Sequence, residues 1–413
     1  MIKTFPRLLK DNMRMLKICM IAHQYYNRDP RVRRYAEALA NDGVQVDIIC
    51  PRDQNILKTS NYDNIRIFTV PVGRSYKGKG SYISEYILSF IFYFIKLTSL
   101  FFRNRYQIIH VHSIPDFLIF TAFFPKIFGA KLILDIKDLM PEVFISKYKV
   151  DVKSKLFKLI KIQEALSAKF AHAIITANSN FKETLIKRGI TFRDIMVINN
   201  IADTKIFNRI LYHKYLAEKN GRFTLIYPGT IAPRYGLEVA VRGLPFLVKN
   251  ITNIRLIIVG AIVEYTKELK RIAKELEVLD KIEFVGIVPI EEVPRYIIQA
   301  DVGIYTGISD PHMDIATPTK VIEYAIMGIP IVAPRLKILE DLFTDSSIMF
   351  FESGNIEEFS NCILKLYKSP ELRSQLVKNA DRDFVSKHSW EHEKNKYYDL
   401  LNGLLPKGYK LPG

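Results

Sequence analysis

The stretch KICMIAHQYYNRDPRVRRYAEALANDGVQVDIIC, residues 17–50, predicts the architecture of the chain. Residues 17–22 and 44–50 are short apolar runs, typical of strands that are covered on both faces. Residues 30–43 lie between them and follow a helical pattern that stops at a glycine. A strand, a helix and a second strand in this order are typical of a parallel α/β sheet.

The same alternation continues along most of the chain. A first series of apolar runs passes through IRIFTV, QIIHVH, KLILD, AIIT and IMVI and ends at Ile198. A second series begins with FTLIYPG at residues 223–229 and passes through IRLIIVG, IEFVG, DVGIY and IPIVA. We therefore expect an α/β protein of two doubly wound, Rossmann-like domains facing a central cleft, because ligands of such sheets bind at the carboxyl ends of the strands. The expected domains are residues 1–210 and 211–385, and residues 386–413 are expected to form a helix that packs back on the first domain.

The composition suits two globular domains in a reducing compartment. The chain has 413 residues, of which 48% are hydrophobic and 25% charged, enough for two ordinary cores. Cys19, Cys50 and Cys362 are too few and too widely spaced for a disulfide framework or a zinc site. Residues 1–14 lack the continuous apolar run of a secretory signal, so we expect a cytoplasmic protein.

The net charge of +17 is confined to the first half of the chain. Residues 1–210 contain 34 Lys and Arg against 17 Asp and Glu, whereas residues 211–413 contain 26 of each kind. This imbalance predicts an anionic partner for the first half, such as a membrane surface, a lipid phosphate or a nucleic acid.

Two segments of the first half suggest membrane contact. Residues 83–102 are apolar for about the length that spans a bilayer, although Glu85 and Lys96 interrupt them. A helix that is partly buried and partly rests on lipid fits better than a spanning helix, which would split a sheet whose next strand follows at once. Residues 150–170 form a basic amphipathic pattern suited to an anionic membrane surface, or equally a core helix with a solvated lysine face.

The stretch TPTKVIEYAIMGIPIVAP, residues 317–334, carries two charges that packing does not require. Thr317 is a plausible N-cap, Pro318 suits the first helical position and the helix would begin just before Lys320. A cation in the first turn opposes the helix dipole unless an anion lies at that end. Glu323 lies on the same helix face, so the pair predicts an anion site beside a hydroxyl site, with a surface ion pair as the alternative.

Taken together, these motifs resemble the retaining family 4 glycosyltransferases of the GT-B fold over residues 15–405. The first strand and helix, IIHVHSIPD, LILDIKDLMPE and INNIADTKIF resemble the family's acceptor-binding domain. YPGTIAPRYGLE, IIVG, FVGIVPIEEVPRYIIQADVGIY and residues 317–334 resemble its nucleotide-sugar domain, and HSWEHEKNKYYDLL resembles its closing helix.

The resemblance implies transfer of a sugar from a nucleotide-sugar, expected to be a UDP-sugar, with retention at the anomeric carbon. It implies a glycan or lipid-linked acceptor in cell-surface polysaccharide or glycolipid synthesis, and a location on the inner face of the cell membrane. The diphosphate would be stabilised by Arg234, Lys320 and the helix start, and the donor ribose held by Glu323. The implied donor-binding residues are Gly229, Thr230, Arg234, Gly260, Val285, Pro318, Thr319, Lys320 and Glu323. No cofactor and no metal are expected, because the sequence offers no convincing Asp-x-Asp metal motif and no cysteine/histidine ligand cluster.

The chain departs from the family pattern at several positions. Ile315 stands where the family often has the first glutamate of a Glu-x7-Glu pair, with Asp310 and Asp314 nearby but out of register. The arginine and lysine of the family's GRLxxxKG motif fall on Thr230 and Tyr235, so Arg234 is the expected substitute. The histidine of its HELfPE motif is replaced by Lys137.

His112 is the candidate catalytic residue of the first domain, because it matches the family's active-site histidine at a strand end. Asp116 is expected to orient its ring or bind an acceptor hydroxyl, or alternatively to cap the next helix. Asp29 and Arg31 lie in the first strand-to-helix loop and are candidates for acceptor or phosphate contacts.

Two other functions remain open from the sequence. A GT-B epimerase or phosphorylase would keep the fold, but it would act without an acceptor or consume inorganic phosphate. A nucleic-acid binder would use the basic half, but the chain shows no recognised motif and its basic helices are interleaved with aliphatic rather than stacking aromatic residues, so we expect no nucleic-acid partner.

Overall fold

The computed structural model describes residues 15–52, 64–72, 79–191, 193–218 and 221–412. Residues 1–14, where we predicted no secretory signal, lie outside the described residues. The chain forms two compact units. Unit 1 contains Met1–Pro141, Asp151–Asn199 and Glu391–Gly413, and unit 2 contains Glu142–Val150 and Asn200–Trp390.

Unit 1 is built on a seven-stranded parallel sheet in the order β3-β2-β1-β4-β5-β6-β7. The strands β1, β4 and β5 are buried almost throughout, as expected for a parallel sheet that is covered on both faces. Their bounds are β1 Lys17–Ala22, β2 Gln45–Pro51, β3 Ile65–Val70, β4 Ile108–His112, β5 Lys131–Ile136, β6 Ala173–Thr176 and β7 Ile195–Val197.

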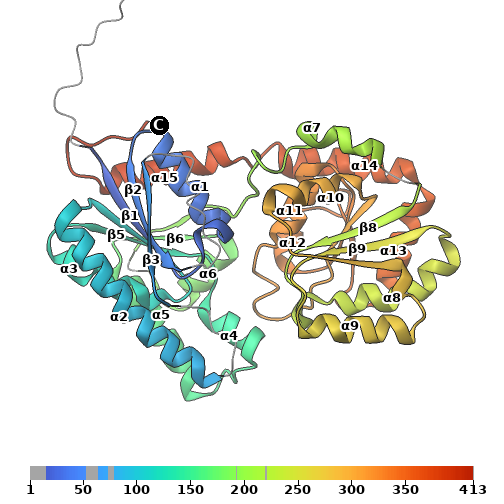
Figure 1. Cartoon of the computed structure of the whole chain (residues 1–413), viewed down its shortest axis with the longest axis horizontal. Helices are drawn as coiled ribbons and strands as arrows, with labels where there is room; N and C mark the ends of the chain where they lie inside the picture. Colours follow the sequence, from blue (N-terminus) through green and yellow to red (C-terminus); the bar gives the residue numbers. More distant parts are fainter. Residues whose placement is uncertain (1–14, 53–63, 73–78, 192, 219–220, 413) are drawn as a thin grey trace, which may run out of the picture. The chain divides into compact units, whose positions relative to one another are not determined.

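Helices α1 and α15 cover one face of this sheet, and α2, α3 and α5 cover the other (Figure 1). Pro30 opens α1 and Asp29 caps it, accepting a hydrogen bond from the Val32 N–H at 3.2 Å. The bounds are η1 Tyr26–Arg28, α1 Pro30–Asn41, α2 Lys79–Asn104, η2 Asp116–Ala122, α3 Phe123–Ile127, α5 Lys155–Phe170, α6 Ser179–Lys187 and α15 Trp390–Leu404. Helix α4, Met140–Tyr148, continues from unit 1 into the segment that belongs to unit 2.

Helix α2 is long and apolar enough to cross a membrane over Tyr86–Asn104, with a mean hydropathy of 1.4. Tyr93 and Leu97 on one side of it are nevertheless fully buried in unit 1. The Tyr93 hydroxyl donates to the carbonyl of Ala22, at the end of β1, at 2.9 Å. These contacts make α2 part of the α/β layer, because a spanning helix would have to give them up.

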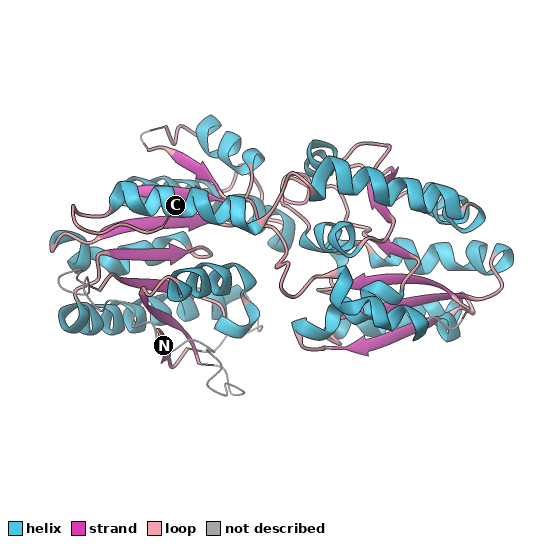
Figure 2. Ribbon diagram, turned by 90° about the horizontal axis from the view of Figure 1, so that it is seen from above, coloured by secondary structure: helices cyan, strands magenta, loops and turns pink. Residues whose placement is uncertain are grey.

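Unit 2 has a six-stranded parallel sheet in the order β10-β9-β8-β11-β12-β13. Alternate residues of β8 enter two apolar cores, with Ile226 in one and Leu225 in the other. The strands are β8 Phe223–Pro228, β9 Ile254–Val259, β10 Ile282–Gly286, β11 Val302–Ile304, β12 Ile331–Pro334 and β13 Met349–Phe351. Figure 2 shows helices on both faces of each sheet. The helices of unit 2 are α7 Arg209–Tyr212, η3 His213–Glu218, η4 Pro233–Tyr235, α8 Leu237–Asn250, α9 Glu264–Glu275, η5 Leu279–Lys281, η6 Ile290–Glu292, α10 Val293–Gln299, α11 Thr319–Met327, α12 Lys337–Leu342, α13 Ile356–Lys368, α14 Pro370–Ala380 and η7 Asp381–Val385.

The prediction of two doubly wound parallel sheets is confirmed. In each sheet the strand order reverses once, between β1 and β4 in unit 1 and between β8 and β11 in unit 2. The helices that follow these strands leave in opposite directions, which opens a crevice at the carboxyl edge of the sheet. A ligand site is therefore expected near each of these two switch points.

Candidate active site

Lys320 lies in the first turn of α11, and its ammonium group is surrounded by aromatic rings. The side chain is buried, and Nζ lies 4.3, 4.8 and 5.2 Å from the ring centroids of Tyr227, Tyr235 and Tyr305. Nζ also donates to the Tyr227 hydroxyl at 3.1 Å. Burial lowers the pKa of Lys320 to about 8, against the opposing effect of Glu323. The rings hold the cation by cation–π attraction but supply no negative charge, so an anion at this position would gain a full ionic interaction.

The start of α11 has no side-chain cap. The helix begins at Thr319 with Pro318 as its N-cap, one residue later than we predicted, and Pro318 has no side chain that accepts a hydrogen bond. The prediction of Thr317 as the N-cap is therefore wrong, because the backbone is still extended at Pro318, with ψ 97°. An uncapped first turn leaves backbone N–H groups for a ligand, and the helix dipole favours an anionic one.

Arg234 lies in η4, in the loop that follows β8 at the switch point. Its Nη2 donates to the Tyr235 hydroxyl at 3.1 Å, and its guanidinium lies 5.0 Å from the Tyr235 ring centroid. Nη1 is buried and has no hydrogen-bond partner among the described residues. The Arg234 carbonyl accepts from the Ile308 N–H at 3.0 Å, which fixes the loop against the segment after β11. Arg234 is thus held in place while its Nη1 group stays available to a ligand.

The glycines of the predicted site allow close backbone packing beside Lys320. A Cβ on Gly260 would lie 2.1 Å from the Gly229 carbonyl oxygen, and one on Gly229 would lie 3.1 Å from Lys320 Cε. Thr230 is exposed, and its carbonyl accepts from the Tyr227 hydroxyl at 2.8 Å. Val285, near the end of β10, is half-buried and packs against a core cluster. The end of β8 therefore lies beside the Lys320 side chain, and the residue that follows β9 packs against the end of β8.

Glu323 lies one turn after Lys320 on α11 and is half-buried. Its charge raises the pKa of Lys320, which places the carboxylate within electrostatic reach of the ammonium. The two acids near Ile315 have other partners. Asp310 accepts from Ser146 Oγ at 2.6 Å and from the N–H groups of two following residues, and Asp314 accepts from a serine hydroxyl at 3.0 Å.

In unit 1, His112 lies at the carboxyl end of β4, beside the switch point. Its Nδ1 lies 3.1 Å from Asp135 Oδ2, and its buried Nε2 has no hydrogen-bond partner among the described residues. Arg31 donates to both oxygens of Asp135, at 2.8 and 2.9 Å, and to the Ile198 carbonyl at 2.9 Å. Burial would raise the pKa of Asp135, but Arg31 and His112 hold it well below its usual value. Arg31 therefore orients the Asp135 and His112 pair from inside the unit.

Asp135 was missed by the sequence analysis, and a signal for it was present. It ends the apolar run LILD, and β5 pairs with β4 so that Asp135 lies opposite His112. We had expected Asp116 to orient the His112 ring, to bind an acceptor hydroxyl or to cap a helix. The structure gives the first role to Asp135, while η2 begins at Asp116 with Pro115 as its N-cap.

Asp116 and Asp29 have contrasting surroundings. Neither oxygen of Asp116 has a hydrogen-bond partner among the described residues, and burial raises its pKa to about 7. Asp29 caps α1 and also pairs with the Lys137 ammonium. Burial would raise the pKa of Asp29, but the charge and hydrogen bond of Lys137, together with His112 and the Val32 N–H, outweigh burial and lower the pKa. Lys137, which replaces the family histidine, thus fixes the loop that carries Asp29.

His110, His112 and Asp135 have ligand atoms that lie within 4.8 Å of one another. The surroundings do not favour a metal there. Arg31 already occupies both oxygens of Asp135, and a divalent cation would be repelled by the guanidinium. His110 Nδ1 is hydrogen-bonded to the Tyr397 hydroxyl at 2.9 Å.

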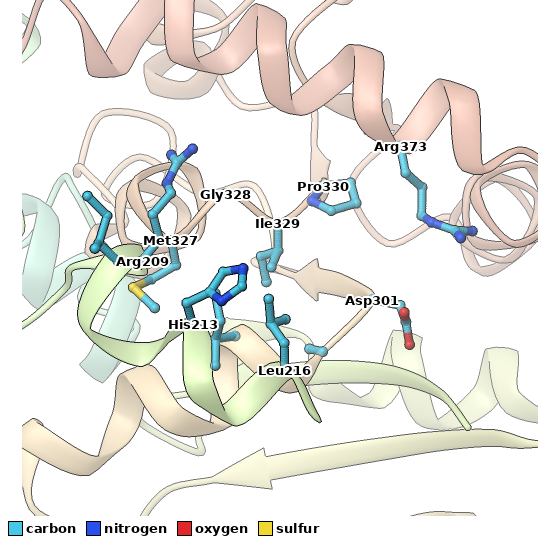
Figure 3. A pocket seen from close by; sticks show the side chains of 12 residues that line it. Arg209, His213, Leu216, Asp301, Met327, Gly328, Ile329, Pro330 and Arg373 are labelled. Atoms are coloured by element: carbon cyan, nitrogen blue, oxygen red, sulfur yellow. The ribbon is translucent and has the colours of Figure 1, made fainter. Parts of the chain in front are cut away.

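A cavity of about 540 Å³ lies at the opposite edge of the unit 2 sheet, where Asp301 precedes β11 and Pro330 precedes β12 (Figure 3). None of the predicted site residues lines it. Arg209 at its wall is occupied, because it donates to both oxygens of Asp381 and to two carbonyls of α11. The cavity is therefore separate from the switch point and its cations.

The comparisons with known proteins agree with this geometry. Residues 208–383 match the family described as Glycosyl transferases group 1, and residues 31–206 match Glycosyltransferase Family 4. The Glycosyltransferase 1 domain-containing protein 1 of Xenopus tropicalis is 26% identical over 163 residues, which are 38% of this chain and 43% of that protein. The chain therefore spans less than half the length of this curated relative.

Two solved structures show the same fold at low sequence identity. A sucrose-phosphate synthase from Thermosynechococcus elongatus matches with a TM-score of 0.76 and 18% identity, over 94% of this chain and 99% of that one. The Anabaena protein Alr3699/HepE, solved in complex with UDP and glucose, matches with a TM-score of 0.68 and 14% identity, over 94% of this chain and 100% of that one.

Proposed function

Because the chain belongs to the group 1 and family 4 glycosyltransferases and has their GT-B fold, we propose that it transfers a sugar from a UDP-sugar to a glycan or lipid-linked acceptor. The observation that carries this proposal is the cation site at the start of α11. Lys320 lies among tyrosine rings, the helix start is uncapped and Arg234 has an unused donor. A diphosphate supplies the negative charge and the acceptor oxygens that this site lacks.

Glu323 lies where the remainder of a nucleotide would follow the diphosphate along α11. A carboxylate can accept hydrogen bonds from two ribose hydroxyls at once, whereas Lys320 and Arg234 can only donate. The choice of uridine is supported by the Anabaena structure with UDP, whose fold this chain shares.

The proposed reaction is a front-face displacement with retention. The bond between the anomeric carbon and the diphosphate oxygen breaks, and its electron pair leaves with the diphosphate. The acceptor hydroxyl forms a bond to the same face of that carbon, and its proton passes to the departing diphosphate oxygen. Arg234, Lys320 and the helix dipole stabilise the negative charge as it develops. His112, with Nε2 unpaired and Nδ1 fixed by Asp135, is proposed to contact the transferred sugar.

The acceptor and the location are proposed from the distribution of charge. The excess of basic residues lies in residues 1–210, which include most of unit 1. A lipid-linked acceptor on the inner face of the cell membrane would place anionic headgroups beside this unit. Synthesis of a cell-surface polysaccharide or glycolipid fits such an acceptor.

The test is a thermal-shift screen of the purified chain across nucleotide-sugars, followed by product analysis with the best donor. A ligand that binds the native state raises the melting temperature according to its affinity. We expect UDP-sugars to raise it and other nucleotides to do so less. Conversion of the donor without acceptor would indicate an epimerase, and consumption of inorganic phosphate a phosphorylase. The absence of any shift would contradict the proposed donor site.

A further inference from the structure

Helix α2 exposes a stripe of large apolar side chains opposite its buried side. Ile87, Leu88, Ile91, Ile95 and Phe102 are each between 45% and 60% exposed. Their spacing of three to four residues along most of this stretch keeps them on one side of the helix. Only 28% of the most apolar window of α2 is buried inside the protein, so most of this hydrophobic surface faces outward.

Helices α3 and α5 extend this surface. Phe124 of α3 contacts Phe94 of α2 with ring centroids 5.6 Å apart. Lys126 of α3 lies over the Phe170 ring of α5 at 4.0 Å and donates to the Phe170 carbonyl at 2.7 Å. We call the outward side of these three helices the apolar face. Its exposed members are Ile87, Leu88, Ile91, Ile95 and Phe102 of α2, Phe123, Phe124 and Ile127 of α3 with the adjoining Phe128, and Leu156, Leu159, Ile162 and Leu166 of α5.

The apolar face is bordered by cations, and residues 86–104, 123–127 and 155–170 expose no carboxylate. Glu164, the only acidic residue of α5, is buried and paired with Arg188 at 2.7 Å. The exposed cations of the three helices are Arg103, Lys155, Lys158, Lys161 and Lys169. An apolar surface of this extent is unusual for a protein that meets only water, and its rim selects a negatively charged partner.

We propose that the apolar face of unit 1 docks on an anionic lipid bilayer, with α2, α3 and α5 lying in the plane of the interface. The apolar side chains would enter the boundary between headgroups and acyl chains, and the lysine side chains would reach the headgroup phosphates. Lysines interleaved with leucines fit a bilayer, whose headgroups are anionic and whose interior is apolar. An acidic protein would pair with the lysines but would offer the isoleucines and phenylalanines no apolar surface. This inference rests on the proposed membrane-linked acceptor and names the surface of the protein that would dock on the membrane. Its test needs neither donor nor acceptor.

The test is flotation of the full chain with lipid vesicles. We expect the protein to float with vesicles of phosphatidylglycerol and phosphatidylcholine in equal parts, and much less with phosphatidylcholine alone. Added salt should weaken the binding, because part of the attraction is screened.

The charged rim is tested with the triple variant Lys155→Gln, Lys158→Gln and Lys161→Gln. We expect its vesicle affinity to fall on the order of 100-fold, since each cation near an anionic surface contributes about fivefold. The matched control is the triple variant Lys249→Gln, Lys274→Gln and Lys378→Gln, which removes as many exposed lysines from unit 2. The control should float like the unchanged protein.

The apolar part is tested with Ile91→Gln and Ile95→Gln. Each should weaken binding by about tenfold, because each half-exposed side chain would lose its burial in lipid. Ile210→Gln is the control, since Ile210 is 81% exposed on unit 2.

Three outcomes would overturn the docking surface. These are failure of the full chain to float, equal losses in the test and control variants, or a dimer in sedimentation that the Ile91 and Ile95 variants dissociate. The last result would mean that a second copy of the chain covers the apolar face. Thermal shift by UDP-sugars, measured on the same samples, distinguishes these failures from a failure of the proposed transferase function.

Discussion

At the scale of single residues, Lys320 has the most distinctive surroundings in unit 2. Its ammonium is buried among three tyrosine rings, and its pKa is lowered to about 8 by that burial. The sequence predicted an anion site from the position of Lys320 alone. It gave no sign of the cage, because Tyr227, Tyr235 and Tyr305 come from three different segments.

The affinity for UDP should therefore depend on pH. Binding needs the charged ammonium, so affinity should fall as pH rises through about 8 and be about tenfold weaker at pH 9 than at pH 7. Titration calorimetry in buffers of different ionisation enthalpy would measure this loss and the accompanying proton uptake. Lys320→Met should bind UDP weakly and with little change over this range. An equal pH dependence in Lys320→Met would assign the effect to another group.

The stability of the ligand-free protein should change with pH in the opposite direction. The unfolded chain keeps the proton of Lys320 up to a pKa of about 10.4, whereas the folded chain loses it near 8. Between these values the unfolded state binds more protons, so the free energy of unfolding should rise with pH relative to Lys320→Met. Urea denaturation of both proteins across this range would measure the difference.

Arg234 is the second cation of the proposed donor site, and its Nη1 is unused. Arg234→Ala should weaken UDP binding by about tenfold to a hundredfold, since a hydrogen bond to a charged group contributes about 1.5–3 kcal/mol. Calorimetry would measure the affinity, and the melting temperature without ligand should change little. Arg242→Ala is a suitable control, because Arg242 pairs with Glu238 on the exposed side of α8. Unchanged UDP affinity in Arg234→Ala would remove Arg234 from the site.

At the scale of elements, the parallel register of β1, β4 and β5 brings three strand ends together. Ala22 lies opposite His112, and His112 lies opposite Asp135. Arg31, at the start of α1, donates to Asp135 and also to the carbonyl of Ile198, which lies 167 residues after Arg31 in the chain. A sequence pattern predicts each strand, but not which strand ends are neighbours, so the role of Asp135 was not predicted.

Asp135→Asn should destabilise unit 1 by about 3–5 kcal/mol, because it leaves the buried Arg31 guanidinium without its counter-charge. Urea denaturation followed by circular dichroism would measure this. Arg31→Met combined with Asp135→Leu should recover much of the loss, since neither charge then remains buried. A double variant no more stable than Asp135→Asn would mean that the ion pair itself carries the stability.

The loop after β8 depends on a glycine that ends η4. Gly236 has φ 61°, and a Cβ there would lie 1.9 Å from the Thr306 carbonyl oxygen. Gly236→Ala should shift the loop that carries Arg234, lowering both the melting temperature and UDP affinity. Gly403→Ala is the control, because Gly403 lies in α15 with no atom within 4 Å of the added group. Scanning calorimetry with and without UDP would compare the two, and equal behaviour would contradict the role of Gly236.

Element boundaries were predicted with uneven success, for physical reasons. The strand at residues 17–22 and the helix start at Pro30 were confirmed, because apolar runs and a proline preceded by an aspartate are local signals. The start of α11 was wrong by one residue, because threonine and proline are both acceptable at neighbouring positions of a helix start. Gly328 ends α11 as its C-cap, with φ 73°.

At the scale of the whole molecule, each unit takes segments from distant parts of the chain. Residues 142–150 belong to unit 2 although most of the neighbouring chain belongs to unit 1, and Ser146 is fixed there by Asp310. Alternating strands and helices predicted two sheets, but they carried no information about this exchange. In the sequence, Ser146 resembles any other polar residue.

Helix α15 completes unit 1 after the whole of unit 2 in the chain. Tyr397 reaches His110, and the Tyr398 hydroxyl donates to Asp42 at 2.6 Å. Truncation before residue 390 should therefore weaken unit 1 and spare unit 2. Hydrogen exchange read by mass spectrometry should show lost protection in β1 and β4 and unchanged protection in β8 and β9. Equal loss in both sheets would contradict the independence of the two cores.

This arrangement also has a consequence for synthesis on the ribosome. The strands of unit 1 emerge early, but the helix carrying Tyr397 is translated only after every strand of unit 2. The buried histidines of β4 therefore gain this partner only after every strand of unit 2 has been translated. We therefore expect unit 2 to complete its fold before unit 1, although the strands of unit 1 come first in the sequence.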